Sequence, residues 1–542
     1  GVDVLYMHRI TAANVSDGYI KNIVLESSDG TKPEKTISAK MFIDCTYEGD
    51  LMAKAVVSYT IGREDNSKYN ETYNGVQLMK GHQFPDGIDP YKVQGDSASG
   101  LLWGISSDKL LPDGTGDKLV QAYNYRICLT DNSDNRVEIT KPDNYDPEKY
   151  ELLLRLFDAQ PDKRKLNHYF IWSRMPNGKT DINNRGGFST DMIGMNHNYP
   201  EASYEERAEI IKQHKDYTQG LLYFYKTDPR VPQELRDEIQ SWGYPKDEYV
   251  NDGHWSPQLY IRESRRMTGD YVMTQAHCEG REVVEDGIGM AAYTMDSHNC
   301  QRIVVQKDGK YMVKNEGNVE IGGGLPYPVS YRSITPKAEE CKNLLVPVCL
   351  SASHIAYGSI RMEPVFMVLA QSAAVAAVEA IETGSVQSVD VKKVQNILHE
   401  NPLLDGSFSE ILIDDSDLDL SVNSDWEIIK KQGGYGPSFL KAKSKNGQSV
   451  RFTPNIEHDG KYRIYVYYHM DKDVSSTIAY TVSNGNEVWT KAINKEDVVV
   501  EGQTTGEWIE LGAYDFKKAA KPYVEVSAKN ADGNVIADAV LL

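Results

Sequence analysis

Hydrophobic and polar positions alternate with period two near the start of the chain, in GVDVLYMHRI and then in YIKNIVLES. This alternation predicts strands with one exposed face. The Asp29-Gly30 dipeptide predicts a hairpin turn after the second of them. The short apolar run Met41–Ile43 ends abruptly at Asp44 and predicts a strand buried on both faces, as in a parallel sheet. The first ten residues lack the basic and long apolar regions of a secretory signal.

Helical spacing follows in four stretches, at 147–157, 204–224, 231–242 and 364–383. Pro364 suits the first position of the last helix, and Gly384 suits its C-terminal cap. An aromatic-rich region, residues 65–335, holds the first three helices between segments punctuated by proline and glycine. We interpret this region as a substrate or cap domain.

Period-two alternation returns near the C-terminus, in KYRIYVYY, STIAYTVS, EWIELGAYDF and YVEVSA. Turns that contain Asn and Gly separate these segments, which predicts an all-β module, most simply a sandwich. The acidic stretch that starts at Asp414 marks the boundary before it. That stretch is not an EF-hand, because Leu420 stands where the calcium loop needs glycine.

Composition narrows the class of protein. The chain has 542 residues, too many for one core, and a formal net charge of −20. We find no cationic cluster, so we expect no nucleic-acid partner. No run of 18 apolar residues occurs, and the most apolar stretch, 365–381, is broken by Gln371, Ser372 and Glu379. We therefore expect no membrane span. The six cysteines include no C-x-x-C pair.

Two strand–loop–helix units carry candidate ligand-binding residues. The first contains Asp44, Thr46, Gly49 and Asp50. An acid at a strand end and a glycine at a helix start can hold a ribose and approach a phosphate group. The alternative is a helix cap with no ligand, and spacing alone slightly favours that alternative.

The second unit lies before the helix at 364–383, whose N-terminus would attract an anionic group. Its candidates are Ser353, His354, Gly358, Arg361, Met362 and Glu363. Alternatively, Arg361 pairs with Glu363, and His354 is an ordinary hydrogen-bonded residue. One such loop is weak support for a ligand site, and two in one chain are stronger.

Several blocks of the sequence, in order, resemble a large family of bacterial FAD-dependent oxidoreductases. They include FIDCTYEGDLMAKAVVSYTIGRE, DINNRGGFSTDMIG, LYIRESRRMTGDYVMTQ, YTMDSHNCQR and NLLVPVCLSASHIAYGSIRMEPVFMVLAQSAAVAA. The resemblance implies an α/β FAD-binding domain of the glutathione-reductase-like type, at 1–64 and 336–405. An α+β substrate domain at 65–335 is inserted in it. FAD would be the cofactor, with the first loop positioning it and the second lining its isoalloxazine or ribityl side.

The sequence departs from that family in one respect. Family members begin with a strand, a GxGxxG turn and a helix, whose amides cradle the FAD pyrophosphate. No GxGxxG motif follows a strand in this sequence. We expect the chain to start downstream of that motif and, alone, to hold FAD weakly.

Candidate catalytic residues lie in the family-like blocks of the substrate domain. His298, in the MDSH block, would act as an acid or base near the flavin, with Arg262 and Arg265 beside the substrate. Alternatively, the arginines form ion pairs and His298 is a buried hydrogen-bonding residue. A further group of polar residues would either line a polar substrate pocket or stabilise local turns, namely Asp181, Asn183, Asn184 and Asp191.

The C-terminal module, residues 411–542, resembles the golvesin/xanthan-lyase carbohydrate-binding-like domain. The likeness rests on GGYGPSF, VRFTPNIEHDGKYRIYVYY, EWIELGAYDF and the closing ADAV. It implies a β-sandwich that binds polysaccharide. Aromatic residues either stack on sugars or belong to the core, namely Trp426, Tyr435, Trp489 and Trp508.

These observations predict an FAD-dependent oxidoreductase that transfers hydride between flavin and an organic substrate, a small molecule or a saccharide. The alternative is a non-redox carbohydrate-active or glycan-binding protein with a vestigial flavin fold. A polysaccharide lyase of that kind would use His298 with Arg265. The glycan-binding-like module leads us to expect export to the periplasm or the outside of the cell.

Overall fold

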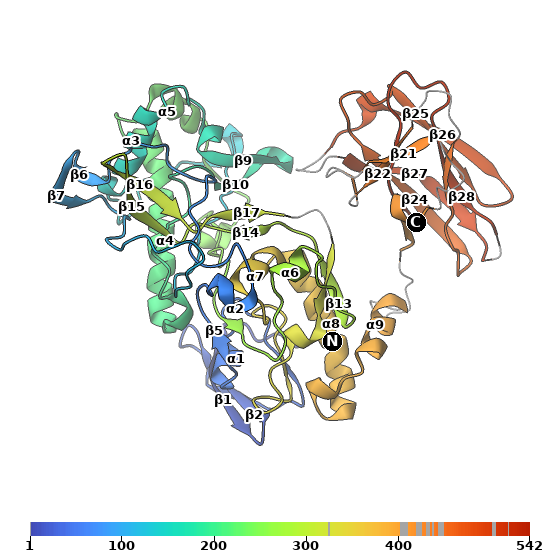
Figure 1. Cartoon of the computed structure of the whole chain (residues 1–542), viewed down its shortest axis with the longest axis horizontal. Coiled ribbons are helices and arrows are strands. Elements are labelled where there is room, and N and C mark those ends of the chain that lie inside the picture. Colours follow the sequence, from blue (N-terminus) through green and yellow to red (C-terminus); the bar gives the residue numbers. More distant parts are fainter. Residues whose placement is uncertain are drawn as a thin grey trace. The chain divides into compact units, whose positions relative to one another are not determined.

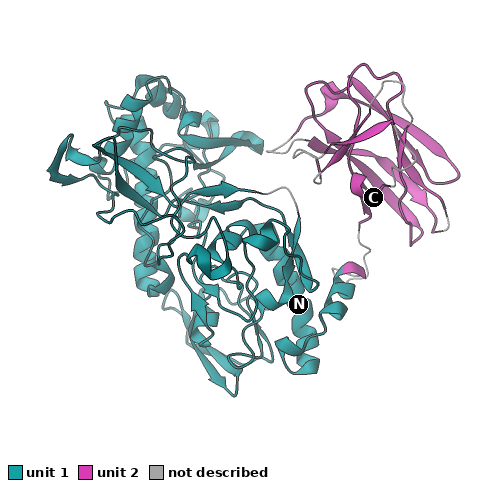
Figure 2. Ribbon diagram, in the orientation of Figure 1, with its two compact units in different colours: residues 1–398 teal, residues 399–542 magenta. Residues whose placement is uncertain are grey.

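The structure is a computed structural model that divides into two compact units, residues 1–398 and 399–542 (Figure 2). It describes residues 2–322, 326–400, 410–418, 425–429, 434–435, 438–442, 449–500, 506–518 and 520–542. The finer division at residues 64 and 335 stays a prediction.

Unit 1 begins with an antiparallel sheet, β1 (His8–Ser16), β2 (Tyr19–Ser27) and β3 (Lys35–Ile37). The predicted Asp29-Gly30 turn lies between β2 and β3, and Gly30 has φ 70°. Asp17-Gly18 makes a second, tighter turn between β1 and β2. Both of its residues have positive φ, 57° and 77°, which suits the two-residue turns that match strand twist.

The predicted buried strand is β4 (Phe42–Ile43), and it pairs in parallel with β19 (Leu344–Leu345). The Asp44 N–H donates to the Leu345 carbonyl at 2.9 Å. Parallel strands have their carboxyl ends at the same edge of a sheet. The pairing therefore brings the two candidate loops, which are some 300 residues apart in sequence, to one edge.

Helices after β19 form the second half of this region, with α7 (His354–Ile360), α8 (Glu363–Thr383) and α9 (Val391–Glu400). As predicted, α8 has proline in its first turn and ends at Gly384 with φ 86°. The α8 helix is long enough and apolar enough to cross a membrane, but half of its most apolar stretch is buried inside the structure. Leu369 and Ala373 of α8 belong to a hydrophobic core that also includes Leu345 of β19.

The three other predicted helices are confirmed to within a few residues, as α3 (Glu151–Ala159), α4 (Tyr204–Thr227) and α5 (Gln233–Gln240). The α4 helix starts with a capping box, in which Ser203 and Glu206 bond each other's backbone N–H. It is the long vertical helix in Figure 1. Three short helices complete the set in unit 1: α1 (Asp50–Lys54), α2 (Asn66–Tyr69) and α6 (Gln275–Cys278).

Short paired strands connect the helices of unit 1. The pairs are β6 (Tyr91–Val93) with β7 (Asp96–Leu101), β8 (Arg136–Val137) with β11 (Tyr244–Pro245), β9 (Phe170–Met175) with β10 (Lys179–Asn184), β12 (Arg266–Met267) with β5 (Tyr59–Thr60), β13 (Gly287–Ala291) with β18 (Tyr327–Ser330), β14 (Met295–Ser297) with β17 (Val319–Ile321), and β15 (Gln301–Lys307) with β16 (Lys310–Glu316). Several of these pairs join segments that are far apart in the sequence, so they fix the loops between the helices.

Unit 2 is β-rich, as predicted. The four segments with period-two alternation form the strands β24 (Gly460–His469), β25 (Thr477–Ser483), β27 (Gly506–Phe516) and β28 (Tyr523–Ser527). Two four-stranded sheets have the orders β20-β30-β24-β27 and β23-β28-β25-β26. Ile464 of the first and Ile478 of the second belong to the same hydrophobic core. The remaining strands are β20 (Leu412–Ile413), β21 (Trp426–Ile429), β22 (Phe439–Ala442), β23 (Val450–Phe452), β26 (Val488–Asn494), β29 (Ile536–Ala537) and β30 (Val540–Leu541).

Residues on the buried face of α8 should contribute more to the free energy of unfolding than residues on its exposed face. We expect Leu369→Ala to lower the free energy of unfolding by about 2–5 kcal/mol, because it leaves a cavity in the core. Met367→Ala on the exposed face of the same helix should change it by less than about 0.5 kcal/mol. Calorimetric unfolding of the two variants checks this, and equal losses would contradict the assignment of faces.

Candidate functional site

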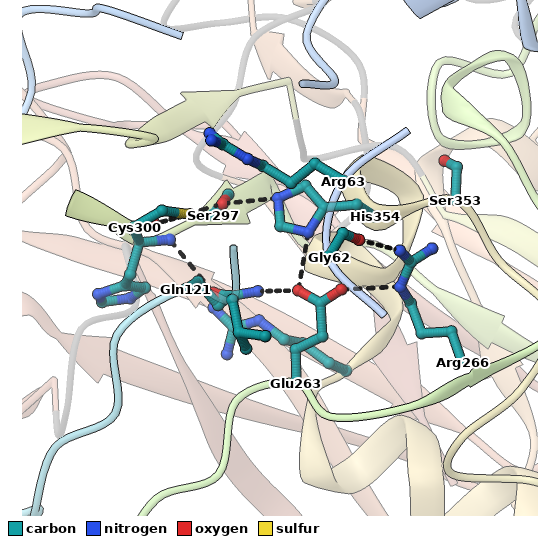
Figure 3. A network of polar contacts seen from close by, with 12 residues as sticks. Gly62, Arg63, Gln121, Glu263, Arg266, Ser297, Cys300, Ser353 and His354 are labelled. Atoms are coloured by element: carbon teal, nitrogen blue, oxygen red, sulfur yellow. Dashed lines mark hydrogen bonds and ion pairs between the residues drawn. The ribbon is translucent and has the colours of Figure 1, made fainter. Parts of the chain in front are cut away.

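A buried network of charges centres on Arg266, whose side chain is completely buried. Its guanidinium forms ion pairs at 2.7 Å with both Glu64 and Glu263. It also donates to the carbonyls of Gly62 and Ala352 (Figure 3). Burial by itself raises the pKa of Glu64, but the Arg266 charge and hydrogen bonds lower it to about 2. This carboxylate therefore stays charged inside the protein.

The network extends from Glu263 toward α7 and β14. Oε2 of Glu263 lies 2.8 Å from Nδ1 of His354 and accepts from the Gln121 side chain at 2.7 Å. Nε2 of His354 lies 2.9 Å from the Ser297 hydroxyl (Figure 3). Oε1 of Gln121 in turn accepts from the His298 N–H at 3.2 Å. The buried network thus holds the backbone at His298.

His298 lies in a second buried cluster, with Asp191 and Arg262. Its Nδ1 is 2.8 Å from Oδ2 of Asp191, and the other carboxylate oxygen is 3.0 Å from Nη1 of Arg262. The His298 Nε2 has Oδ1 of Asp296 at 3.7 Å, too far for a hydrogen bond. One ring nitrogen is therefore held by a carboxylate, while the other has no hydrogen bond to any residue that the structure describes.

Arg262 and the neighbouring Arg361, which pairs with Asp296, have hydrogen-bonding atoms without a partner in the described part of the chain. These buried atoms are Nε and Nη2 of Arg262 and Nε of Arg361. The rest of the Arg361 guanidinium contacts Asp296 and the Tyr260 hydroxyl, each at 3.2 Å. A buried donor without an acceptor costs about 1–3 kcal/mol, and more when it is charged. An oxygen-bearing ligand would remove that penalty.

The electrostatics of the cluster favour a neutral histidine. Burial raises the pKa of Asp191, but Arg262 and His298 outweigh it and lower the value to about 2. Burial and then the Arg262 charge lower the pKa of His298, although Asp191 opposes them. A neutral imidazole beside a carboxylate carries its proton on Nδ1. Nε2 is then free to accept a proton.

The structure separates the three predicted catalytic residues. Arg262 and His298 share Asp191, whereas Arg265 forms ion pairs at 2.8 Å with Asp50 and Glu201. Asp50 also pairs with Arg207 at 2.7 Å. A predicted cofactor residue and a predicted catalytic residue therefore meet in one ion-pair cluster.

In the first candidate loop, Asp44 and Thr46 act as caps. Both oxygens of Asp44 are used, by the Thr46 backbone and hydroxyl and by the Met52 N–H. Gly49 has φ 67°, and a Cβ there would lie 2.8 Å from the Met52 side chain. The capping alternative thus describes the contacts seen, and a cofactor role for these residues stays a prediction.

In the second candidate loop Ser353 has hydrogen-bond partners within the protein, whereas the start of α8 has no side-chain cap. Ser353 caps α7 and donates to Glu71 at 2.6 Å, and a Cβ on Gly358 would lie 2.7 Å from the Asp296 carbonyl. Met362 is the N-cap of α8 and gives it no side-chain cap, so the first N–H groups of this long helix remain for another acceptor. Glu363 is the exposed first residue of α8. The start of α8 fits the anionic part of a cofactor.

Other residues proposed from the sequence have polar partners in unit 1. Asp181 pairs with Arg126, and Asn183 accepts from Asn124 at 2.8 Å. Asn184 lies 3.4 Å from His82. These contacts hold the three side chains to neighbouring segments and leave a substrate role for them a prediction.

Three residues of the site were not among the candidates predicted from the sequence: Gln121 and Glu263, which connect the two clusters, and Asp296, which pairs with Arg361. Glu263 carried a recognisable signal, because it is an acid among three arginines in the run IRESRR. Asp296 also carried one, because it stands two residues before His298 in the MDSH block, whereas Gln121 has no such pattern around it.

Removal of one charge from the buried network should destabilise unit 1. We expect Glu64→Gln to lower the free energy of unfolding by about 3 kcal/mol, because Arg266 loses one of its two buried ion pairs. The exposed pair of Glu205 with Arg9 provides the control, and Glu205→Gln should change the unfolding midpoint very little. Urea unfolding measures both, and a midpoint unchanged by Glu64→Gln would contradict this role.

Comparisons with known proteins divide the chain at the same place as the two units. A family model described as FAD dependent oxidoreductase matches residues 1–398, and one described as Golvesin C-terminal domain matches residues 411–542. No curated protein matches the chain.

Two similar solved structures each match about a quarter of the chain. A Paenibacillus xanthan lyase is 22% identical over 24% of this chain and 13% of that one, with a TM-score of 0.21. A Podospora anserina GH26-CBM35 β-(1,4)-mannanase is 10% identical over 24% of this chain and 27% of that one, with a TM-score of 0.19. The present chain thus spans a small part of either protein, and scores this low carry no structural argument. The family model covers more than half of the residues, and on that basis this chain belongs to the FAD dependent oxidoreductase family and ends in a Golvesin C-terminal domain.

Proposed function

We propose that this flavin oxidoreductase oxidises an alcohol carbon of an organic substrate, or reduces the corresponding carbonyl, at the cluster of His298, Asp191, Arg262 and Arg361. The observation that carries the proposal is the pairing of a carboxylate-held histidine with buried arginine donors that lack acceptors. A substrate oxygen would accept from those donors and supply the missing hydrogen bonds.

In the oxidation direction, Nε2 of His298 takes the hydroxyl proton of the substrate. Asp191 holds the ring by Nδ1 and stabilises the imidazolium that forms. Arg262 and Arg361 hold the oxygen and favour its negative charge as the proton leaves. A bound flavin would supply the two-electron oxidant, so that the substrate, after giving its hydroxyl proton to His298 and a hydride from its carbon to the flavin, would leave as a carbonyl compound.

The cofactor would lie along the edge where β4 and β19 end. Arg361, Met362 and Glu363 would face its isoalloxazine or ribityl part, with the start of α8 supplying positive potential. We also propose the glutathione-reductase-like arrangement for this unit. Because the sequence contains no GxGxxG motif after a strand, the chain alone would retain FAD weakly.

We propose that the substrate is a saccharide, and that unit 2 is a β-sandwich that binds it. Two aromatic rings support it: Tyr435, which is 46% exposed, lies 5.3 Å from Trp508 between ring centroids, and the buried Tyr467 ring lies 6.0 Å from that of Tyr435. Rings of this kind stack on sugar faces. Trp426, in contrast, is buried in the core. A glycan substrate would also favour export to the periplasm or beyond.

The cofactor proposal is tested by visible absorbance. We expect the natural full-length protein to show flavin bands near roughly 370 and 450 nm. The present chain, reconstituted with FAD and then gel-filtered, should lose most of that colour. A colourless full-length protein that FAD does not reconstitute would favour a non-redox carbohydrate-active protein and overturn the proposal.

The catalytic proposal is tested by His298→Gln in the flavin-loaded full-length protein. Once an alcohol or saccharide substrate has been found, flavin reduction by it should slow by about 10²–10⁴-fold, with the flavin spectrum unchanged. Because burial lowers the pKa of His298, the wild-type rate should fall only when the pH drops below the usual range of histidine. Stopped-flow reduction across pH measures this, with His458→Gln on unit 2 as the control. A wild-type-like rate for His298→Gln would exclude the proposed base.

A further inference from the structure

Unit 2 contains three aspartates whose carboxylates converge. Asp414 and Asp415 follow β20, and Asp538 lies between β29 and β30. One oxygen from each can be chosen so that all three lie within 4.8 Å of one another. The two segments are more than 120 residues apart in the sequence, so the cluster exists only in the folded unit.

Each carboxylate has one oxygen used by the protein and one left over. The Oδ2 atoms accept from the Ser416 hydroxyl, the Ser438 hydroxyl and the Tyr435 N–H, at 2.7, 2.9 and 3.0 Å respectively for Asp414, Asp415 and Asp538. The three Oδ1 atoms are all buried and have no hydrogen-bond partner among the residues that the structure describes. Asp415 and Asp538 are each only 2% exposed.

The cluster has little positive charge around it. Among the described residues, no lysine or arginine forms an ion pair with any of the three aspartates, and the nearest basic group is His469, 4.0 Å from Asp538. Burial, followed by the charges of neighbouring aspartates, raises the pKa of Asp538 to about 7. Buried carboxylates are ordinarily paired or coordinate a metal.

We propose that Asp414, Asp415 and Asp538 bind a divalent cation of the Ca²⁺ type through one carboxylate oxygen each. Ca²⁺ takes oxygen ligands at about 2.3–2.6 Å, so two oxygens on one ion lie at most about 5 Å apart, and the cluster meets that limit. The site is unlike the EF-hand that the sequence excludes. Leu420, the residue that excluded it, lies outside the described part of the chain.

The cation would also hold in place the backbone at Tyr435, on the surface of unit 2. The Tyr435 N–H that donates to Asp538 belongs to the residue whose ring contacts Trp508 and Tyr467. An ion on Asp538 therefore orders the backbone beneath this aromatic group. The inference concerns unit 2 alone and does not depend on the proposed redox function.

The test uses the whole chain after removal of metals with a chelator. Isothermal titration with Ca²⁺ should show one ion bound per chain. Hydrogen–deuterium exchange should slow in peptides that contain Asp414–Asp415 and Asp538 but not in unit 1. Asp538→Asn and Asp415→Asn should weaken binding by about tenfold or more, because each removes a charged ligand. Asp414→Asn, at the least buried of the three, serves if those variants do not fold.

Asp459→Asn is the matched control, since Asp459 pairs with Lys517 on the surface of the same unit and should leave Ca²⁺ binding unchanged. Absence of binding at millimolar Ca²⁺ by the folded wild type would overturn the proposal, as would wild-type binding by the Asp variants. A rise in thermal stability on Asp538→Asn, with and without Ca²⁺, would show that the cluster holds protons instead. Tighter binding of Mg²⁺ than of Ca²⁺ would overturn the choice of ion.

Discussion

The buried guanidinium of Arg266 is the interaction on which the rest of unit 1 depends. It joins its own segment, which includes Glu263, to two distant segments through Glu64 and the Ala352 carbonyl. Bringing such a charge out of water costs several kcal/mol, which only close and complete hydrogen bonding can offset. Because the segment at Ala352 leads into α7, the same contacts fix where that helix begins. The position of the second candidate loop follows from the position of this one cation.

The second buried cluster in unit 1 differs from the first in how many of its arginine nitrogens have hydrogen-bond acceptors. Arg266 has an acceptor for each part of its guanidinium, whereas Arg262 has two nitrogens with none. Burial alone does not explain the difference. Among the described residues Arg302 also has buried nitrogens without hydrogen-bond partners, and both arginines make a cation–π contact, Arg302 at 4.8 Å from the centre of the Phe188 ring and Arg262 at 5.1 Å from the centre of the Tyr260 ring. What distinguishes Arg262 is its place beside a histidine with an open ring nitrogen.

The sequence predicts best what depends on neighbouring residues. Pro364 and Gly384 correctly delimit α8, because a helix cap is determined within one turn. The candidate site depends on contacts across the chain. His298, Arg262 and Asp191 are each recognisable as polar residues in family-like blocks, but nothing local shows that Asp191, 107 positions from His298, is the partner of both. By the same reasoning Arg262 and Arg265, three residues apart, were indistinguishable until their different carboxylate partners were known.

The two units deal with buried carboxylates in different ways, and the difference follows from the residues available to each. In unit 1, Glu64 and Glu263 are neutralised by an arginine of the same chain, and the pKa of each is lowered despite burial. In unit 2, Asp415 and Asp538 have hydroxyl and amide donors but no such cation among the described residues, and their pKa values rise instead. Hydrogen bonds from neutral donors do not compensate the burial of these carboxylates and the added repulsion among like charges. Only a proton or a metal ion can, and three converging oxygens that share no donor suit the metal ion better.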